Sequence, residues 1–174
     1  MTYQKLNNWT GWGVWLIATT VYLSTIEPTA SFWDCGEFIA SAYKLEVGHP
    51  PGAPFFMLLA RFLMIFATPE TAAVFANSLS ALSSSFTILF LFWSITHLAK
   101  KMTVDPAGEV TSAERWAVMG AGAVGALAYT FSDSFWFSAV EGEVYALSSL
   151  FTALVFWAIL KWETVADQPG HLRW

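Results

Sequence analysis

Four long apolar runs alternate with polar segments along the chain. They cover residues 10–26, 73–98, 116–132 and 144–160, and none contains Asp, Glu, Lys or Arg. The shortest runs hold 17 residues, which as an α-helix extend about 26 Å, close to the ~30 Å hydrocarbon core of a bilayer. The pattern therefore predicts four membrane-spanning helices.

The segment 27–72, between the first two apolar runs, predicts two amphipathic helices rather than another span. Residues 31–46 show helical periodicity, with a polar face of Asp34, Glu37, Ser41 and Lys44. Residues 54–67 are apolar but too short to cross comfortably, and they carry Arg61 near the middle, where a charge is costly in lipid. We expect both helices to lie along the membrane interface.

The distribution of charge predicts which face each loop occupies. If residues 54–67 do not cross, six of the eight basic residues share one face: Lys5, Lys100, Lys101, Arg115, Lys161 and Arg173. The positive-inside rule makes that face cytoplasmic. Eight of the thirteen acids then lie on the outer face, which would be periplasmic or lumenal: Glu27, Asp34, Glu37, Glu46, Glu70, Asp133, Glu141 and Glu143.

Composition agrees with an integral membrane protein. Of the 174 residues, 56% are hydrophobic and 12% are charged, against roughly 25% charged residues in soluble domains. The net charge of −5 argues against nucleic acid as a partner, since phosphate binding needs clustered cations. We expect an all-α polytopic membrane protein, with residues 1–174 forming a single membrane domain.

Three motifs fall in the expected outer loops. They are Trp33-Asp34-Cys35-Gly36-Glu37-Phe38, His49-Pro50-Pro51-Gly52 and Ala139-Val140-Glu141-Gly142-Glu143-Val144-Tyr145. In this order they resemble the protein O-mannosyltransferase-like family of the GT-C glycosyltransferase clan. Such enzymes carry many more spans, so the resemblance implies the amino-terminal part of a longer chain, with a GT-C-like module that is inactive alone.

The resemblance also implies a reaction. A hexose, with mannose as the first candidate, would pass from a polyprenyl-phosphate carrier to a protein Ser or Thr, with inversion, on the non-cytoplasmic face of a bacterial inner membrane or an ER-type membrane. Two alternatives remain open from the sequence: a glycosyltransferase acting on lipid or polysaccharide acceptors, and a non-enzymatic transporter or lipid-binding scaffold. Membrane lipids are expected partners in every case.

The family's first-loop aspartate falls on Asp34, the candidate base. A hydroxyl that attacks an anomeric carbon must lose a proton, which a carboxylate can accept, and a nearby carboxylate also favours an oxocarbenium-like transition state. Glu37, three residues later, would share the face of Asp34 and raise its pKa or hydrogen-bond a substrate. The alternative is that both acids are merely solvated on the polar face of an interfacial helix.

The remaining candidates are substrate-binding residues. His49 could bind the leaving phosphate or only brace its proline turn, and Arg61 could pair with a lipid phosphate or snorkel to ordinary headgroups. Glu141 and Glu143, followed by Tyr145, would open the fourth span; two residues apart on a helix they point to different sides, and Glu141 is preferred. Together with Asp34 they could hold a divalent cation, but no ligand count is readable, so no metal ligand is assigned.

Overall fold

The computed structural model describes residues 2–50, 52–104 and 110–167, and every regular element in these ranges is a helix. The all-α class predicted from the sequence is therefore confirmed. In chain order the elements are α1 (Tyr3–Ser24), α2 (Cys35–Lys44), α3 (Pro54–Leu63), the 3-10 helix η1 (Met64–Phe66), α4 (Ala72–Thr103), α5 (Ser112–Thr130), α6 (Asp133–Val140) and α7 (Val144–Glu163).

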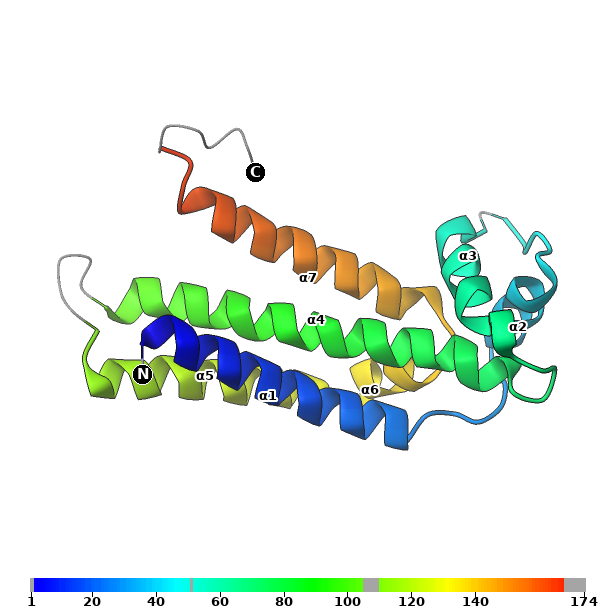
Figure 1. Ribbon diagram of the computed structural model, residues 1–174, viewed down its shortest axis with the longest axis horizontal. Coiled ribbons are helices and arrows are strands. Elements are labelled where there is room, and N and C mark those ends of the chain that lie inside the picture. The colour runs from blue at the N-terminus through cyan, green and yellow to red at the C-terminus, as the bar shows by residue number, and fades with distance from the viewer. Residues whose placement is uncertain (1, 51, 105–109, 168–174) are drawn as a thin grey trace.

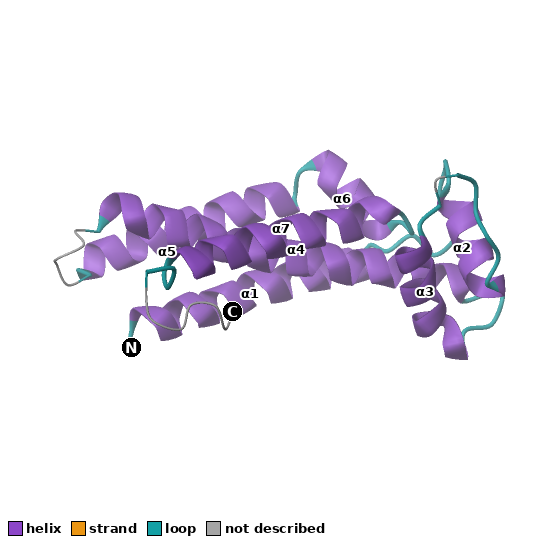
Figure 2. Ribbon diagram, turned by 90° about the horizontal axis from the view of Figure 1, so that it is seen from above, coloured by secondary structure: helices purple, strands orange, loops and turns teal. Residues whose placement is uncertain are grey.

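The long helices run lengthwise through the molecule, with α4 packed against α1, α5 and α7 (Figure 1). Their shared core contains Tyr22 of α1, Phe92 of α4 and Met119 of α5. The short helices α2 and α3 gather at one end of this bundle (Figures 1 and 2). There Cys35 and Phe56 belong to a second hydrophobic cluster, which holds α2 and α3 against the first turns of α4.

Two of the described helices, α4 and α7, are both long enough and apolar enough to cross a membrane. The helices α1 and α5 have 22 and 19 residues, or about 33 and 28 Å at 1.5 Å per residue. They have the length of a span, but they are less apolar. Hydropathy thus supports two of the four predicted spans.

Several helix ends differ from those predicted. Helix α1 begins at Tyr3 rather than at residue 10, because the Thr2 side chain caps it by accepting from the Lys5 amide. Helix α5 begins at Ser112 rather than at residue 116, behind a capping box of Thr111 and Glu114. Apolar runs report the part of a helix suited to lipid, whereas side-chain caps set where the helix starts.

The predicted loop 27–72 does contain two helices, each shorter than expected. Helix α2 starts at Cys35 instead of residue 31, and it ends where Leu45 takes a left-handed conformation, with φ of 58°. Helix α3 starts at Pro54 and passes into η1 after Leu63. Helix α6, between the third and fourth apolar runs, is an element that the apolar pattern does not predict. Pro51, Pro106, Gly108 and Arg173 lie outside the described residues.

Candidate functional site

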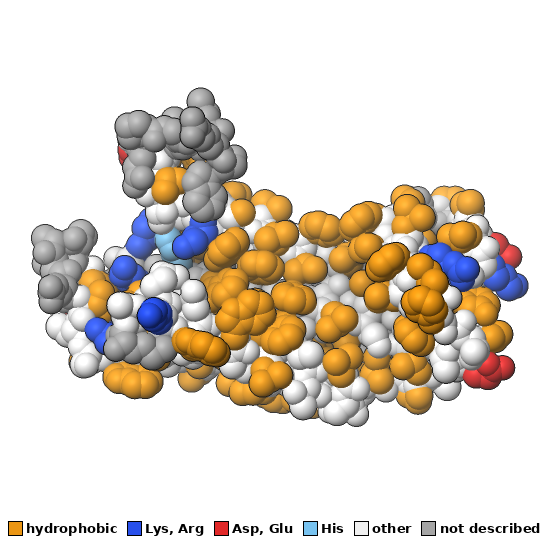
Figure 3. All heavy atoms as spheres, in the orientation of Figure 1, with side chains coloured by type: hydrophobic (Ala, Val, Ile, Leu, Met, Phe, Trp, Pro, Cys, Tyr) orange, Lys and Arg blue, Asp and Glu red, His pale blue; other side chains and the backbone are white. Residues whose placement is uncertain are grey.

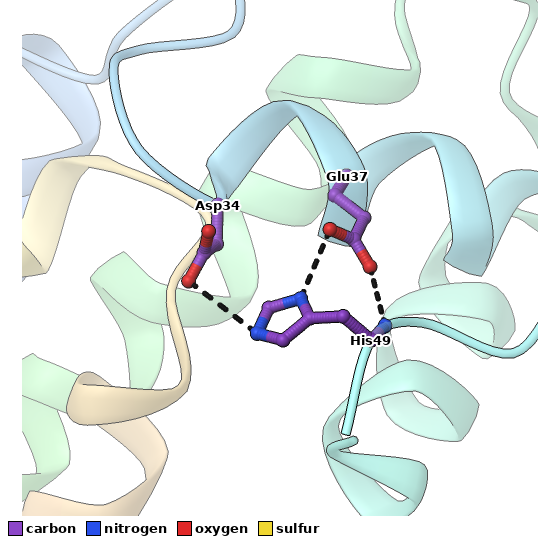
Figure 4. Close-up of side chains that lie close together, drawn as sticks. All are labelled: Asp34, Glu37 and His49. Carbon is purple, nitrogen blue, oxygen red and sulfur yellow. Dashed lines mark hydrogen bonds and ion pairs between the residues drawn. The ribbon is translucent and has the colours of Figure 1, made fainter. Parts of the chain in front are cut away.

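His49 lies between the two acids at the start of α2 (Figure 4). Its backbone N–H donates to Glu37 Oε1 at 2.6 Å, and its ring Nδ1 lies 3.0 Å from Glu37 Oε2. The other ring nitrogen, Nε2, lies 3.8 Å from Asp34 Oδ2. The imidazole therefore separates two carboxylates that sit one helical turn apart.

The local sequence explains this approach. Asp34 is the residue before α2 and Glu37 lies in its first turn, so both side chains are presented at the same end of the helix. After α2 ends, the chain returns past Glu37 at Gly48, where a Cβ would lie 3.0 Å from Glu37 Oε1. The following turn closes with a bond from the Gly52 amide to the His49 carbonyl at 2.8 Å, with Gly52 at φ of 73°.

Hydrogen bonding sets the protonation of this group. The two bonds from His49, the backbone one foremost, lower the pKa of Glu37, and the hydrogen bond to Glu37 is the largest cause that raises the pKa of His49. The charges of Glu37 and Asp34 raise the His49 pKa further. An imidazolium beside two carboxylates is thus favoured, and all three side chains remain open to solvent.

A second pair of acids reaches the site from the turn between α6 and α7. Glu141 and Glu143 are each only 5% exposed. Burial raises the pKa of Glu143 to about 7, and the charges of Glu141 and Asp34 add to the effect. Burial also raises the pKa of Glu141, against a hydrogen bond donated by Ser31 Oγ. The charge of Asp34 therefore acts on a buried acid from a distant part of the chain.

Glu141 and Glu143 do not open the helix of the fourth span, as the sequence predicted, so helical spacing does not separate their side chains. The two residues lie outside α6 and α7, in extended conformations on either side of Gly142. The Glu143 amide donates to the Glu141 carbonyl at 2.9 Å, which closes a three-residue turn. Both carboxyl groups are buried together as a result.

Asn77 of α4 holds these segments in place, and the sequence reading did not single it out. Its amide donates to the backbone carbonyls of Glu27 at 2.6 Å and Thr29 at 3.1 Å. Its Oδ1 lies 3.9 Å from Cys35 Sγ, and a Cβ on Gly142 would lie 2.8 Å from that oxygen. A lone amide in an otherwise uncharged apolar run was the available signal, because polar groups at such positions need partners.

Arg61 and Tyr145 take other positions. Arg61 Nη1 donates to the Tyr43 carbonyl at 2.7 Å, and its guanidinium lies 5.8 Å from the centre of the Tyr43 ring. These contacts brace α3 against the last turn of α2. Tyr145 lies in the first turn of α7 and is exposed.

The arrangement around His49 is suited to two kinds of chemistry. One ligand atom from each of Asp34, Glu37 and His49 lies within 4.8 Å of the others, which suits a divalent cation bound by oxygen and imidazole nitrogen. In the neutral form of the ring, which a cation would require, a bond from Nδ1–H to Glu37 would leave the Nε2 lone pair facing Asp34, an arrangement common around metal-binding histidines. Without a cation, the exposed Asp34 carboxylate is free to accept a proton from a substrate.

Residues 34–174 match the family described as the protein O-mannosyl-transferase TMEM260 N-terminal domain. The protein O-mannosyl-transferase tmem260 of Dictyostelium discoideum is 28% identical over 142 residues, 82% of this chain and 16% of the relative. TMEM260 of Mus musculus is 25% identical over 150 residues, 86% of this chain and 19% of the relative. The chain thus spans less than a fifth of these relatives, and no solved structure matches it.

Proposed function

We propose that this chain is the amino-terminal part of a membrane glycosyltransferase, because it belongs to the TMEM260 N-terminal domain family. Both relatives are named as protein O-mannosyl-transferases, which supports a reaction that moves a hexose, with mannose as the first candidate, to Ser or Thr hydroxyls of proteins. The donor in this proposal is a polyprenyl-phosphate sugar. Because the relatives are several times longer, further spans would complete the donor cavity.

The position of Asp34 is the observation that carries this proposal. Its carboxylate is open to solvent next to His49, and its charge helps to raise the pKa of the buried Glu143. An acceptor hydroxyl would pass its proton to Asp34 as its oxygen bonds to the anomeric carbon. The bond from that carbon to the phosphate oxygen breaks at the same time, and the electron pair leaves with the phosphate, which inverts the anomeric centre.

In this proposal His49 stabilises the leaving phosphate. Because its pKa is raised by Glu37, the ring favours the imidazolium form, and a cation beside the phosphate stabilises the charge that develops there. Glu37 then acts by holding the ring. A divalent cation bound between Asp34 and His49 would supply the same positive charge.

In the proposed arrangement α1, α4, α5 and α7 are spans, and α2 and α3 lie at the non-cytoplasmic interface. Helix α3 supports this placement, since it presents a stripe of exposed apolar side chains at helical spacing: Phe55, Leu58 and Phe62, followed by Phe66 of η1. Such a stripe on a short helix suits the boundary between headgroups and acyl chains. It would fix the height of Asp34 relative to a lipid-linked donor.

The test is Asp34→Asn in the intact protein, in the cells that produce it. Loss of a general base costs about 10² to 10⁴ in rate, so Ser- and Thr-linked hexose on exported proteins should fall at least about a hundredfold, as measured by glycopeptide mass spectrometry. The control is Asp133→Asn, which alters an exposed aspartate at the start of α6 and should leave the hexose unchanged.

The amount of each variant in the membrane must match that of the unsubstituted protein. Unchanged glycopeptides in Asp34→Asn would overturn the role of Asp34. A loss of sugar confined to glycolipid or polysaccharide would overturn the protein acceptor while retaining the glycosyltransferase.

A further inference from the structure

A large cavity lies at the end of the bundle opposite the acidic site. It has a volume of about 990 Å³ and is lined by the first turns of α1 and the last turns of α4 and α7. This volume is at the upper end of the range of small-molecule sites. None of the candidate residues of the proposed glycosyl transfer lines it.

The cavity has an excess of positive charge. Its lining includes Lys100, Lys101 and Lys161, and of these Lys101 is paired with Glu163. Lys100 lies 4.8 Å from the centre of the Tyr3 ring, and Lys161 lies 6.0 Å from that of Trp157. Figure 3 shows several blue side chains around this end, while the far end carries both red and blue ones.

A buried polar atom in the lining has no partner. Asn7 is 9% exposed, and its Oδ1 accepts no hydrogen bond within the described part of the chain. A buried acceptor of this kind is costly unless a donor reaches it. A ligand that carries hydroxyl groups would supply one.

One wall of the cavity is aromatic. The ring of Trp93 lies 6.0 Å from that of Trp12 and 5.7 Å from that of Trp157, so that three helices contribute to a continuous surface. Tryptophan is enriched where headgroups meet acyl chains. The lysines lie just beyond the apolar parts of α4 and α7, at the depth where a phosphate would sit.

We propose that this cavity binds one anionic glycerophospholipid. Its phosphate lies against Lys100 and Lys161, a headgroup hydroxyl donates to Asn7 Oδ1, and the start of its acyl chains rests on the tryptophan wall. Basic pockets between membrane helices bind anionic headgroups in this way. Free phosphate shares the charge but offers neither the hydroxyl nor the chains, so it binds far more weakly.

The test is native mass spectrometry of the 174-residue protein, released from micelles that contain phosphatidylglycerol or phosphatidylcholine. We expect one retained phosphatidylglycerol, with little phosphatidylcholine. Lys100→Gln combined with Lys161→Gln should weaken retention about tenfold or more, because each lysine contributes to the attraction. Asn7→Leu should also reduce the preference for phosphatidylglycerol, without changing the charge.

The matched control is Lys5→Gln combined with Lys44→Gln, which removes two charges from residues outside the lining. Circular dichroism must show equal helix content in all variants. If the control pair lost as much phosphatidylglycerol, the effect would come from net charge alone, and the proposed site would be overturned. Displacement of the lipid by millimolar inorganic phosphate would also overturn the site. The same holds if no lipid is retained at all.

Discussion

Glu143 is a buried carboxyl group whose charged neighbours include two other acids, Glu141 and Asp34. Its pKa rises from 4.5 to about 7, so ionisation opposes folding. Below pH 4.5 both states are protonated and no penalty exists; stability then falls as pH rises to about 7, above which the full penalty remains. Glu143→Gln should therefore stabilise the protein at pH 8, on the order of 2 kcal/mol, and hardly at pH 4. Denaturant unfolding in detergent at both pH values measures this.

Glu46→Gln is the control for that titration. Glu46 is exposed and lies 3.9 Å from Lys44, so its removal should give no gain that grows with pH. A gain from Glu143→Gln of equal size at pH 4 and pH 8 would show that burial does not shift this carboxyl group.

Asn77 has a larger structural role than its small side chain suggests. Asn77→Leu would leave the carbonyls of Glu27 and Thr29 without their donor, at a cost of about 2 kcal/mol. The control is Ser78→Ala, because Ser78 Oγ donates only within its own helix, to the Val74 carbonyl. Unfolding of both variants in one detergent gives the comparison, and equal losses would contradict the role assigned to Asn77.

At the residue scale, the sequence identified the acids of α2 and His49 as candidates but not their contacts. The periodicity of Asp34 and Glu37 is local and therefore readable, whereas the approach of His49 depends on a left-handed Leu45 and on the space left by Gly48. The effect of the Asp34 charge on the pKa of Glu143 joins residues more than a hundred positions apart. Only the packing of helices brings such residues together.

At the scale of elements, close contact between α4 and α5 depends on Gly122. A Cβ there would lie 2.4 Å from Thr96 Cγ2 and 2.9 Å from Phe92 Cε2. Gly122→Ala should therefore cost about 1 to 3 kcal/mol, as overpacking does. Gly120→Ala is the matched control in the same helix, since nothing lies within 4 Å of its Cβ position; it should be neutral, or stabilising by up to about 1 kcal/mol. Equilibrium unfolding of both variants tests the pair, and equal effects would exclude close packing at Gly122.

The apolar pattern predicted the existence of the long helices better than their ends. The capped starts of α1 and α5 lie in polar sequence, at Tyr3 and Ser112, where hydropathy gives no signal but Thr2 and Thr111 do. Helix α6 was not predicted, because its aromatic residues follow the third apolar run closely and its eight residues are too few to show a clear period. A search for residue types that precede helices would have found Ser132, although its hydroxyl donates to the Tyr129 carbonyl and does not cap α6.

For the whole molecule, two groups of charged residues lie at opposite ends, although Lys44 and Arg61 lie at the end with the acids and Glu163 lies with the lysines. The acids of α2 and of the turn between α6 and α7 lie at one end, and the lysines at the ends of α4 and α7 lie at the other (Figures 1 and 3). A bundle that crosses a bilayer with its lysines in the cytoplasm places the acidic site outside. This orientation requires residues 54–67 to return without crossing.

Cysteine labelling tests that orientation. Phe66 is 90% exposed and Met102 is 86% exposed, so a cysteine at either position can react, while the native Cys35 is fully buried and should stay silent. Applied to intact cells, a membrane-impermeant maleimide should label Phe66→Cys at once and Met102→Cys only after permeabilisation. If residues 54–67 crossed the bilayer, both results would be exchanged, because every later segment would change sides. Labelling of Met102→Cys from outside would therefore place the lysines on the outer face and overturn this orientation.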